Sequence, residues 1–544
     1  MAKNPILPID FPDPDVIRVG DTYYMASTTM FLMPGGDILK SKDLVHWELA
    51  AHVFDSLGDD DQYTLKNHKH AYARGMWAPT FRYHEGVFYL SFSCNERKNS
   101  LLFTANQVEG PWKMQEMGDF FYDSSLFFDE DGKVYIVHGN TTVRITELDT
   151  NTWGAKEGGL SRILIQDKPN QPLGFEGSHL YKLNGKYYLF TCHMPEETEG
   201  RKTECCFICD TLEGEFKGKT ILNDAMGYNR PWLQVAQGGL VDDPEGNLYM
   251  FMFHDRGALG RAPVIFPMTF DEEGYPAPDS EGYRIPLYFA GTKGDTYDNY
   301  DYGRNMYFGD EDFSESDIKE LLEKKLWWQI SHNPDYDNIK LLHRDQLDDA
   351  ISTGSDQNEI SLSTDHALRI STGTVVDNLL QARNTMTQRC VYDVCSGEIT
   401  IDPSGLNIGD YAGLCAYSAH YGGLCVGRDE EGLFLAKIES EAESDSIMGD
   451  KDFYERKPVI TKLKSIPESE KVKVRITTDF RNAPDFCTYS YEENGVFVEV
   501  PGKHLLYFKL DIFIGCRFGI FTYSTKEAGG YADFSDFKIQ LGEE

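Results

Sequence analysis

One short pattern occurs five times in this chain: a glycine followed by a segment with central aromatic residues. The copies begin at Gly20, Gly86, Gly132, Gly185 and Gly246, and their spacing is about 45 to 65 residues. Each copy is typical of a turn that leads into a strand, because aromatic and β-branched residues favour strands. The spacing suits four-stranded blades with loops, so the repeat predicts a five-bladed β-propeller.

A second repeated element supports the blade assignment. Three segments that follow an expected strand end on an aromatic residue, and they are residues 41–47, 105–112 and 209–216. We interpret them as turns at the outside of a blade. The last blade is expected to end near residues 267–270.

A residue suited to chemistry or binding stands about ten to twelve positions before each central aromatic pair. These residues are Asp13, Trp77, Asp123, Glu176 and Gln237. The innermost strand of every propeller blade lines one central axis, so the five side chains are expected in one pocket. Two carboxylates that face each other across a pocket are the minimum requirement for glycoside hydrolysis.

The C-terminal part of the chain has a different pattern. Residues 271–315 are rich in Gly, Asp, Tyr and Pro, and residues 314–325 carry one helical pattern with early acids and late lysines. Short alternating segments return later, for example at 361–364, 398–402, 472–476 and 534–539. The predicted fold is therefore all-β, with a propeller at 1–300, a linker at 301–325 and a β-sandwich at 326–544.

The global composition narrows the partners. The net charge is −36, which disfavours nucleic acid and anionic membranes and is compatible with a neutral substrate. No apolar run reaches transmembrane length, and the first residues lack a secretory apolar segment. Asp13 is also so close to the start that removal of a leader would threaten the pocket. A cytoplasmic location is expected.

The cysteines fit the same expectation. There are 11, an odd number without a spaced framework, which favours free thiols over a disulfide scaffold. Cys205, Cys206 and Cys209 form one cluster. Without a second cluster or paired histidines, they are expected to be buried small hydrophobic residues and not zinc ligands.

Several motifs together resemble glycoside hydrolase family 43. In the first half they are residues 4–17, 77–80, 123–127, 176–181 and 260–261; in the second half, 328–335, 381–389 and 532–534 resemble the sandwich of its two-domain β-xylosidase and α-L-arabinofuranosidase members. The resemblance covers nearly the whole chain and implies an inverting hydrolase that requires no cofactor.

The resemblance also implies roles for three carboxylates. Asp13 would be the general base that activates water, and Glu176 the general acid that protonates the leaving group. Asp123 would orient Glu176 and raise its pKa. Asp15 competes with Asp13, but the alternation of a strand predicts that it points away from the axis.

Further residues are expected to bind substrate. Trp77 and Phe31 are candidate walls for a sugar ring, with core packing as the alternative. Arg261 resembles the family arginine that reaches into the pocket. Gln237 departs from the histidine of many relatives and is a poorer metal ligand, so no metal is assigned, although a structural Ca²⁺ at the axis is conceivable. Phe513 would close the rim of the pocket, or else be a core residue of a sandwich strand.

The leading functional hypothesis is an exo-acting, inverting hydrolase that releases terminal β-D-xylose from neutral xylo-oligosaccharides, with α-L-arabinofuranose as a second product. One alternative is a fructan- or sucrose-cleaving enzyme of similar architecture. Its Arg-Asp-Pro signature is absent, and Glu204-Cys205 lies outside the axial phase. Another is a carbohydrate-binding propeller without catalysis, which the three carboxylates argue against. The oligomeric state stays open.

Overall fold

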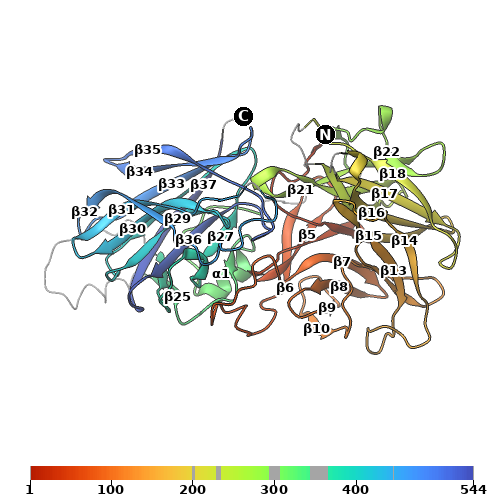
Figure 1. Ribbon diagram of the computed structural model, residues 1–544, viewed down its shortest axis with the longest axis horizontal. Helices are drawn as coiled ribbons and strands as arrows, with labels where there is room; N and C mark the ends of the chain where they lie inside the picture. The colour runs from red at the N-terminus through yellow and green to blue at the C-terminus, as the bar shows by residue number, and fades with distance from the viewer. Residues whose placement is uncertain are drawn as a thin grey trace. The chain divides into compact units, whose positions relative to one another are not determined.

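The chain forms two units in the computed structural model, and both are almost entirely β (Figure 1). The structure describes residues 2–198, 202–227, 234–292, 307–343, 366–444 and 446–542. The boundary expected at residue 300 and the segment 361–364 lie outside these ranges.

The first unit contains five four-stranded antiparallel sheets, as the five-fold repeat predicts. Blade 1 holds β2 (Asp15–Val19), β3 (Thr22–Ser27), β5 (Gly35–Ser41) and β6 (Glu48–Phe54). Blade 2 holds β7 (Trp77–His84), β8 (Val87–Cys94), β9 (Asn99–Ala105) and β10 (Lys113–Glu116). Blade 3 holds β11 (Ser125–Phe128), β12 (Val134–His138), β13 (Thr142–Glu147) and β14 (Ser161–Gln166). Blade 4 holds β15 (Leu173–Leu183), β16 (Lys186–Met194), β17 (Thr203–Cys209) and β18 (Lys217–Leu222). Blade 5 holds β19 (Val235–Asp242), β20 (Leu248–Asp255), β21 (Arg261–Phe270) and β22 (Pro276–Pro278), so it ends later than expected.

The repeated glycine has a conformational cause. All five copies lie in the turn between the first and second strands of a blade, with φ between 64° at Gly20 and 84° at Gly86 and Gly246. A side chain at any of them would meet no atom within 4 Å. The positive φ, and not lack of space, therefore selects glycine here. The predicted outer turns each join the third and fourth strands of their blades.

The ring closes through the N-terminal segment. β1 (Ala2–Lys3) pairs with β23 (Tyr288–Phe289), and β19 of the last blade lies against β2 of the first. The amides of Ile6 and Phe11 donate to the carbonyls of Pro263 and Arg261 at 2.9 and 3.0 Å. This segment thus runs along β21 and delivers Asp13 beside Arg261.

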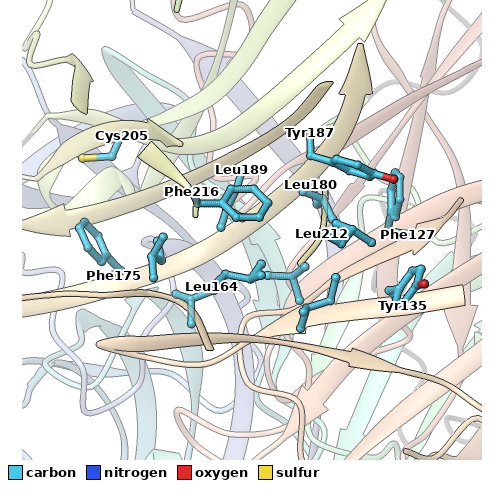
Figure 2. Packing of buried hydrophobic residues seen from close by; sticks show 14 residues of the cluster. Phe127, Tyr135, Leu164, Phe175, Leu180, Tyr187, Leu189, Cys205, Leu212 and Phe216 are labelled. Carbon is cyan, nitrogen blue, oxygen red and sulfur yellow. The ribbon is translucent and has the colours of Figure 1, made fainter. Parts of the chain in front are cut away.

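Apolar side chains fill the spaces between blades. Figure 2 shows one cluster between blades 3 and 4, in which the rings of Phe127 and Tyr187 lie 6.0 Å apart at 72°. Cys205 belongs to this cluster and Cys206 to the next one, so β17 places their thiols on opposite faces. All 11 cysteines are free thiols and ten are buried, which confirms the expectation of a chain without a disulfide scaffold.

The second unit contains two antiparallel sheets, which confirms the predicted sandwich. The eight-stranded sheet has the order β32 (Val459–Ile466), β31 (Gly432–Glu439), β30 (Gly422–Asp429), β29 (Asp410–Tyr417), β36 (Arg517–Ser524), β27 (Met386–Arg389), β24 (Gln329–Ser331) and β4 (Leu32–Met33). The seven-stranded sheet has the order β25 (Ile339–His343), β26 (His366–Ser371), β37 (Tyr531–Leu541), β28 (Val394–Asp402), β33 (Val472–Asp479), β34 (Phe486–Glu493) and β35 (Val496–Leu505).

Helix is sparse, as expected. In the described part of the chain the single α-helix is α1 (Ile318–Lys324), which lies within the predicted 314–325 but begins four residues later. Asp317 caps it by accepting a hydrogen bond from the amide of Glu320. No helix of the described residues is long and apolar enough to cross a membrane.

The division into units differs from the predicted one in one respect. Residues 31–34 and 55–73, which come from the first blade's stretch of sequence, belong to the second unit. Within it, β4 forms the edge strand of the eight-stranded sheet, where Met33 pairs with Ile330. The two units are therefore not consecutive in sequence.

Candidate active site

The five predicted pocket residues lie where the innermost strands begin, at points of irregular backbone. Asp13, Asp123 and Gln237 have φ of 50°, 45° and 59°. The ladder slips after Trp77 in β7 and on both sides of Glu176 in β15. Non-glycine residues at positive φ are uncommon, and bulges redirect side chains next to functional sites. The same irregularity at each blade supports the common role inferred from the repeat.

Asp13 is held by two hydrogen bonds. Arg261 Nη1 donates to Oδ1 at 2.7 Å, and the Thr28 hydroxyl donates to Oδ2 at 2.9 Å. The side chain of Asp13 is only 6% exposed and that of Arg261 12%. The arrangement fixes the Asp13 carboxylate and gives its charge a buried partner.

Arg261 is itself fixed from three sides. Its backbone amide donates to Asp10 at 2.7 Å, and its Nε donates to Asp255 at 3.3 Å. Burial disfavours the charged guanidinium, but Asp13, Asp255 and Asp10 raise its pKa above the usual value. The guanidinium also lies 4.5 Å from the ring centre of Phe253. It is therefore cationic and rigidly placed.

Glu176 is partly exposed and accepts two hydrogen bonds on Oε2. Asn140 Nδ2 donates at 2.7 Å and the Tyr122 hydroxyl at 3.3 Å. Burial raises the pKa of Glu176, against the opposing effects of Lys202 and of the Asn140 hydrogen bond. Burial and the charges of Asp123 and Glu176 also raise the pKa of Tyr122, which keeps it a donor.

Asp123 is a buried carboxyl whose pKa is raised by its surroundings. It is 5% exposed, and its Oδ2 accepts from the amide of Gly177 at 3.2 Å. Burial raises its pKa well above the usual value, and Glu176 and Asp13 add to the effect. Two neighbouring carboxyls that repel each other retain one proton to higher pH than either would alone. A raised pKa lets a carboxyl keep its proton at higher pH, which is the property that a general acid requires.

We predict that Asp123→Asn lowers the pH at which activity is lost on the alkaline side. The amide cannot become negative, so Glu176 no longer titrates against a neighbouring charge and releases its proton at lower pH. The kcat/KM profile against pH measures this shift. An alkaline limb identical to that of the wild type would remove Asp123 from this role.

Gln237 lies on a chain of contacts that leads to Glu176. Its Cγ would be 2.6 Å from a side chain at Gly177, so it packs directly against that residue. Its Oε1 accepts a long hydrogen bond of 3.8 Å from the Cys192 thiol, and its backbone N–H donates to Glu204 Oε2 at 2.6 Å. Glu204, dismissed from its sequence phase, is thus bonded to a pocket residue. It is fully buried, and burial raises its pKa to about 8.

We predict that Glu204→Gln changes how stability depends on pH. An unfolded Glu204 ionises near its ordinary pKa, whereas the folded residue stays protonated to about pH 8. Between these values the unfolded state has already released the proton, so rising pH favours unfolding by up to roughly 1.4 kcal/mol per pH unit. Urea unfolding at several pH values should show this loss in the wild type relative to the variant. Parallel curves would contradict it.

Lys202 completes the positive side of the pocket. It is 3% exposed, donates to Asp255 Oδ2 at 3.4 Å and lies 4.6 Å from the ring centre of Phe253. Asp255 therefore bridges Lys202 and Arg261. The sequence analysis missed Lys202, Asp255, Tyr122 and Asn140, because none of them belongs to the repeated phase; only Tyr122, next to Asp123, had a signal nearby.

The aromatic candidates have different positions. Trp77 is partly exposed, with its ring 6.2 Å from that of Tyr122, so it is available to a sugar near Glu176. Phe31 belongs to the second unit, is fully buried and packs on Tyr72 and His332 at 4.6 and 5.0 Å. It therefore presents no free face to a sugar here, which supports the core-packing alternative.

Phe513 also belongs to the second unit. It lies in the loop before β36 with φ of 59°, is partly exposed and has its ring 5.7 Å from that of Phe508. The alternative that it is a core residue of a strand is wrong, because the loop conformation takes it out of the ladder. Its role at the pocket rim stays a prediction.

The predicted direction of the Asp15 side chain is wrong. It does not point away from the axis but is fully buried, with Oδ2 accepting from Arg82 Nη1 at 2.6 Å and Oδ1 lying 3.6 Å from His179 Nδ1. These partners come from β7 and β15, so Asp15 reaches across the ring. The prediction assumed that Asp13 and Asp15 lie in one regular strand. Asp13 instead precedes β2 and has a positive φ, so the direction of its side chain does not fix that of Asp15.

The same contacts show whether the residues at the axis are suitable ligands for a calcium ion. Ca²⁺ takes about six to eight oxygen ligands. The axial carboxylate Asp15 is already paired with a guanidinium, and the Gln237 carbonyl faces a thiol. This donor set does not fit Ca²⁺. Among the described residues, the acidic group compact enough for a cation is Glu311, Asp312 and Glu315 in the second unit.

Comparison with known proteins agrees with this geometry. A beta-xylosidase of Formosa agariphila is 26% identical over 98% of this chain and 89% of its own length. A non-reducing end alpha-L-arabinofuranosidase of Bacteroides ovatus is 27% identical over 52% of this chain and 54% of its own length. A solved structure described as a bifunctional GH43-CE of Bacteroides eggerthii has a TM-score of 0.82 and 32% identity over 100% of this chain, which spans 64% of that protein.

The two halves match separate family models. Residues 351–540 match the beta xylosidase C-terminal concanavalin A-like domain, in agreement with the sandwich. Residues 2–276 match the model of glycosyl hydrolases family 43. This range contains all five blades except the last two residues of β22. The chain belongs to glycosyl hydrolase family 43.

Proposed function

We propose that the protein is an exo-acting, inverting glycoside hydrolase that releases terminal β-D-xylose from neutral xylo-oligosaccharides and also accepts terminal α-L-arabinofuranose. The observation that carries this proposal is the contrast between its carboxylates. Asp13 is paired with a buried guanidinium, whereas burial raises the pKa of both Glu176 and Asp123. One base and one acid in separate environments are what the reaction requires.

In the proposed reaction, Asp13 takes a proton from a water molecule as its oxygen attacks the anomeric carbon. The glycosidic bond breaks, and Glu176 gives its proton to the departing oxygen. The water oxygen becomes the new anomeric hydroxyl on the opposite face of the ring, and the shortened oligosaccharide leaves as an alcohol. The proton taken by Asp13 and the one lost by Glu176 are exchanged with solvent after release. No metal ion takes part.

Arg261 and Trp77 have supporting tasks. Arg261 keeps Asp13 oriented during proton transfer, and Trp77 offers an aromatic face for the sugar beside Glu176. The choice of pentose is supported by relatives named beta-xylosidase, xylosidase/arabinosidase and arabinofuranosidase. A neutral oligosaccharide is also the partner that the negative chain tolerates best.

We predict that the first product from a β-xyloside is α-xylose, because a single displacement inverts the anomeric centre. Proton NMR of the initial minutes of hydrolysis, before mutarotation, distinguishes the anomers. Initial β-xylose would contradict the mechanism. Nitrophenyl xyloside, arabinofuranoside and fructoside, assayed in parallel, test the substrate class. Cleavage of the fructoside alone would favour the fructan-type alternative, and cleavage of none the binding-protein alternative.

A further inference from the structure

The propeller has a second cavity at the far ends of its innermost strands. It has a volume of about 440 Å³ and is lined by residues 16–18 of β2, 82–84 of β7, 127–130 around the end of β11, 180–183 of β15 and 240–242 of β19. The pocket of Asp13 and Glu176 lies where the same strands begin. The two sites therefore occupy opposite faces of one ring.

The axis is filled between the two sites. Arg82, which lines the cavity, donates to Asp15, to the Ser125 hydroxyl at 2.9 Å and to the Leu126 carbonyl at 2.8 Å. Asp15 has no exposed surface. The second cavity is thus a separate depression with an ion-paired floor, and not the exit of a channel from the active site.

The charged groups around the cavity are already paired. Arg18 binds Asp242 through Nε at 3.1 Å and Nη2 at 2.5 Å. Lys182 binds Asp129 and Glu130 at 3.0 and 2.9 Å. A free anion or cation would have to compete with these pairs, so the cavity does not select an ion. The acidic partners remain accessible, because the side chains of Asp242 and Glu130 are 46% and 83% exposed, so their oxygens can accept from hydroxyls.

Aromatic surfaces accompany these polar groups. Tyr83 lines the cavity and remains 41% exposed, whereas Phe81 of the same strand is fully buried. The His84 ring stacks on Phe128 at 4.3 Å and 15°. Exposed ring faces beside fixed polar groups suit the C–H faces and hydroxyls of sugars. The volume also falls within the range of small-molecule sites, about 300 to 1,000 Å³.

We propose that this cavity is a second, non-catalytic carbohydrate-binding site that takes a neutral oligosaccharide of the substrate's class. The choice of a xylo-oligosaccharide as its ligand rests on the proposed function. Tyr83 provides the stacking surface, and the two ion-paired groups orient the hydroxyls. The site holds a substrate chain on the face opposite the hydrolytic pocket.

The test is a calorimetric titration in which xylotetraose is added to the whole Asp13→Asn protein. This variant is used because it is expected not to hydrolyse the ligand. We expect two binding sites per chain, and one after Tyr83→Ala is added. The matched control is Tyr283→Ala, which removes an equally exposed tyrosine, 44% exposed, that does not line the cavity. It should leave two sites. In the otherwise wild-type enzyme, Tyr83→Ala should change kcat/KM for nitrophenyl xyloside by less than about twofold.

A second readout does not depend on a substitution at Tyr83. The imidazole NMR signal of His84, assigned by its loss in His84→Gln, should shift when xylotetraose is added to Asp13→Asn. A single binding site, or two sites unaffected by Tyr83→Ala with an unmoved His84 signal, would overturn the proposal. Either outcome in a protein whose wild type hydrolyses pentosides would leave the proposed function intact. Absence of pentoside hydrolysis by the wild type would instead defeat the proposed function.

Discussion

Glu176→Gln should lose about 10²- to 10⁴-fold in kcat on xylobiose and recover much of that rate on nitrophenyl xyloside. The natural leaving group is an alkoxide that must be protonated as it departs, whereas a nitrophenolate leaves with little acid assistance. The substitution is well matched to the site, because an amide oxygen can still accept from Asn140 and Tyr122. The steady-state rates of the wild type and of Glu176→Gln on both substrates measure the effect.

Asp13→Asn provides the comparison. It should lose a similar factor on both substrates, since water stays unactivated whichever group leaves. The amide can turn its oxygen toward Arg261 and its NH2 group toward the Thr28 hydroxyl, which can then accept, so a change in folding is not expected to dominate. If both variants depend on leaving-group acidity in the same way, the acid and base are assigned wrongly.

Arg261→Ala should impair activity and stability together. It leaves Asp13 without its cationic partner and Asp255 with Lys202 alone. Removal of one member of a buried ion pair costs about 3 to 5 kcal/mol in the free energy of unfolding. The loss of orientation at the base should lower kcat/KM by about 10²-fold or more. Urea unfolding and steady-state kinetics give the two values.

Arg261→Lys separates charge from geometry. An ammonium restores a positive charge but cannot reach Asp13 and Asp255 with the fixed fork of a guanidinium. We expect it to regain more stability than activity. A folded Arg261→Ala enzyme with wild-type kcat/KM would show that Asp13 needs no such partner.

The sequence predicted the propeller well because each blade repeats the same local cause. A turn glycine at positive φ and an aromatic second strand recur at each blade, and phase then locates Asp13, Asp123 and Glu176. Tyr122, Asn140 and Lys202 could not be found in this way. They lie outside the strands, where nothing repeats, and only folding brings them near Glu176.

The errors have specific physical sources. Asp15 was misplaced because alternation holds only inside a regular strand, and the left-handed backbone at Asp13 breaks the pleat before it. For Phe31, a wall of the sugar pocket and core packing were both open. Phe31 belongs to the second unit, where Tyr72 and His332 pack on its ring, which favours core packing. The sequence could not decide between the two because the residues that cover this ring are distant in the chain.

The edge strand β4 has a consequence for how the protein is made. The ribosome releases Leu32–Met33 long before Gln329–Ser331, the strand to which they pair. Blade 1 can therefore assemble early, but its 31–34 and 55–73 excursions must wait for nearly the whole remaining chain. A chain stopped after the propeller would carry these excursions without their partners, and a chain begun at the sandwich would lack the edge strand β4. The hydrolase and its sandwich are thus one unit of synthesis and inheritance, and neither is expected to survive excision alone.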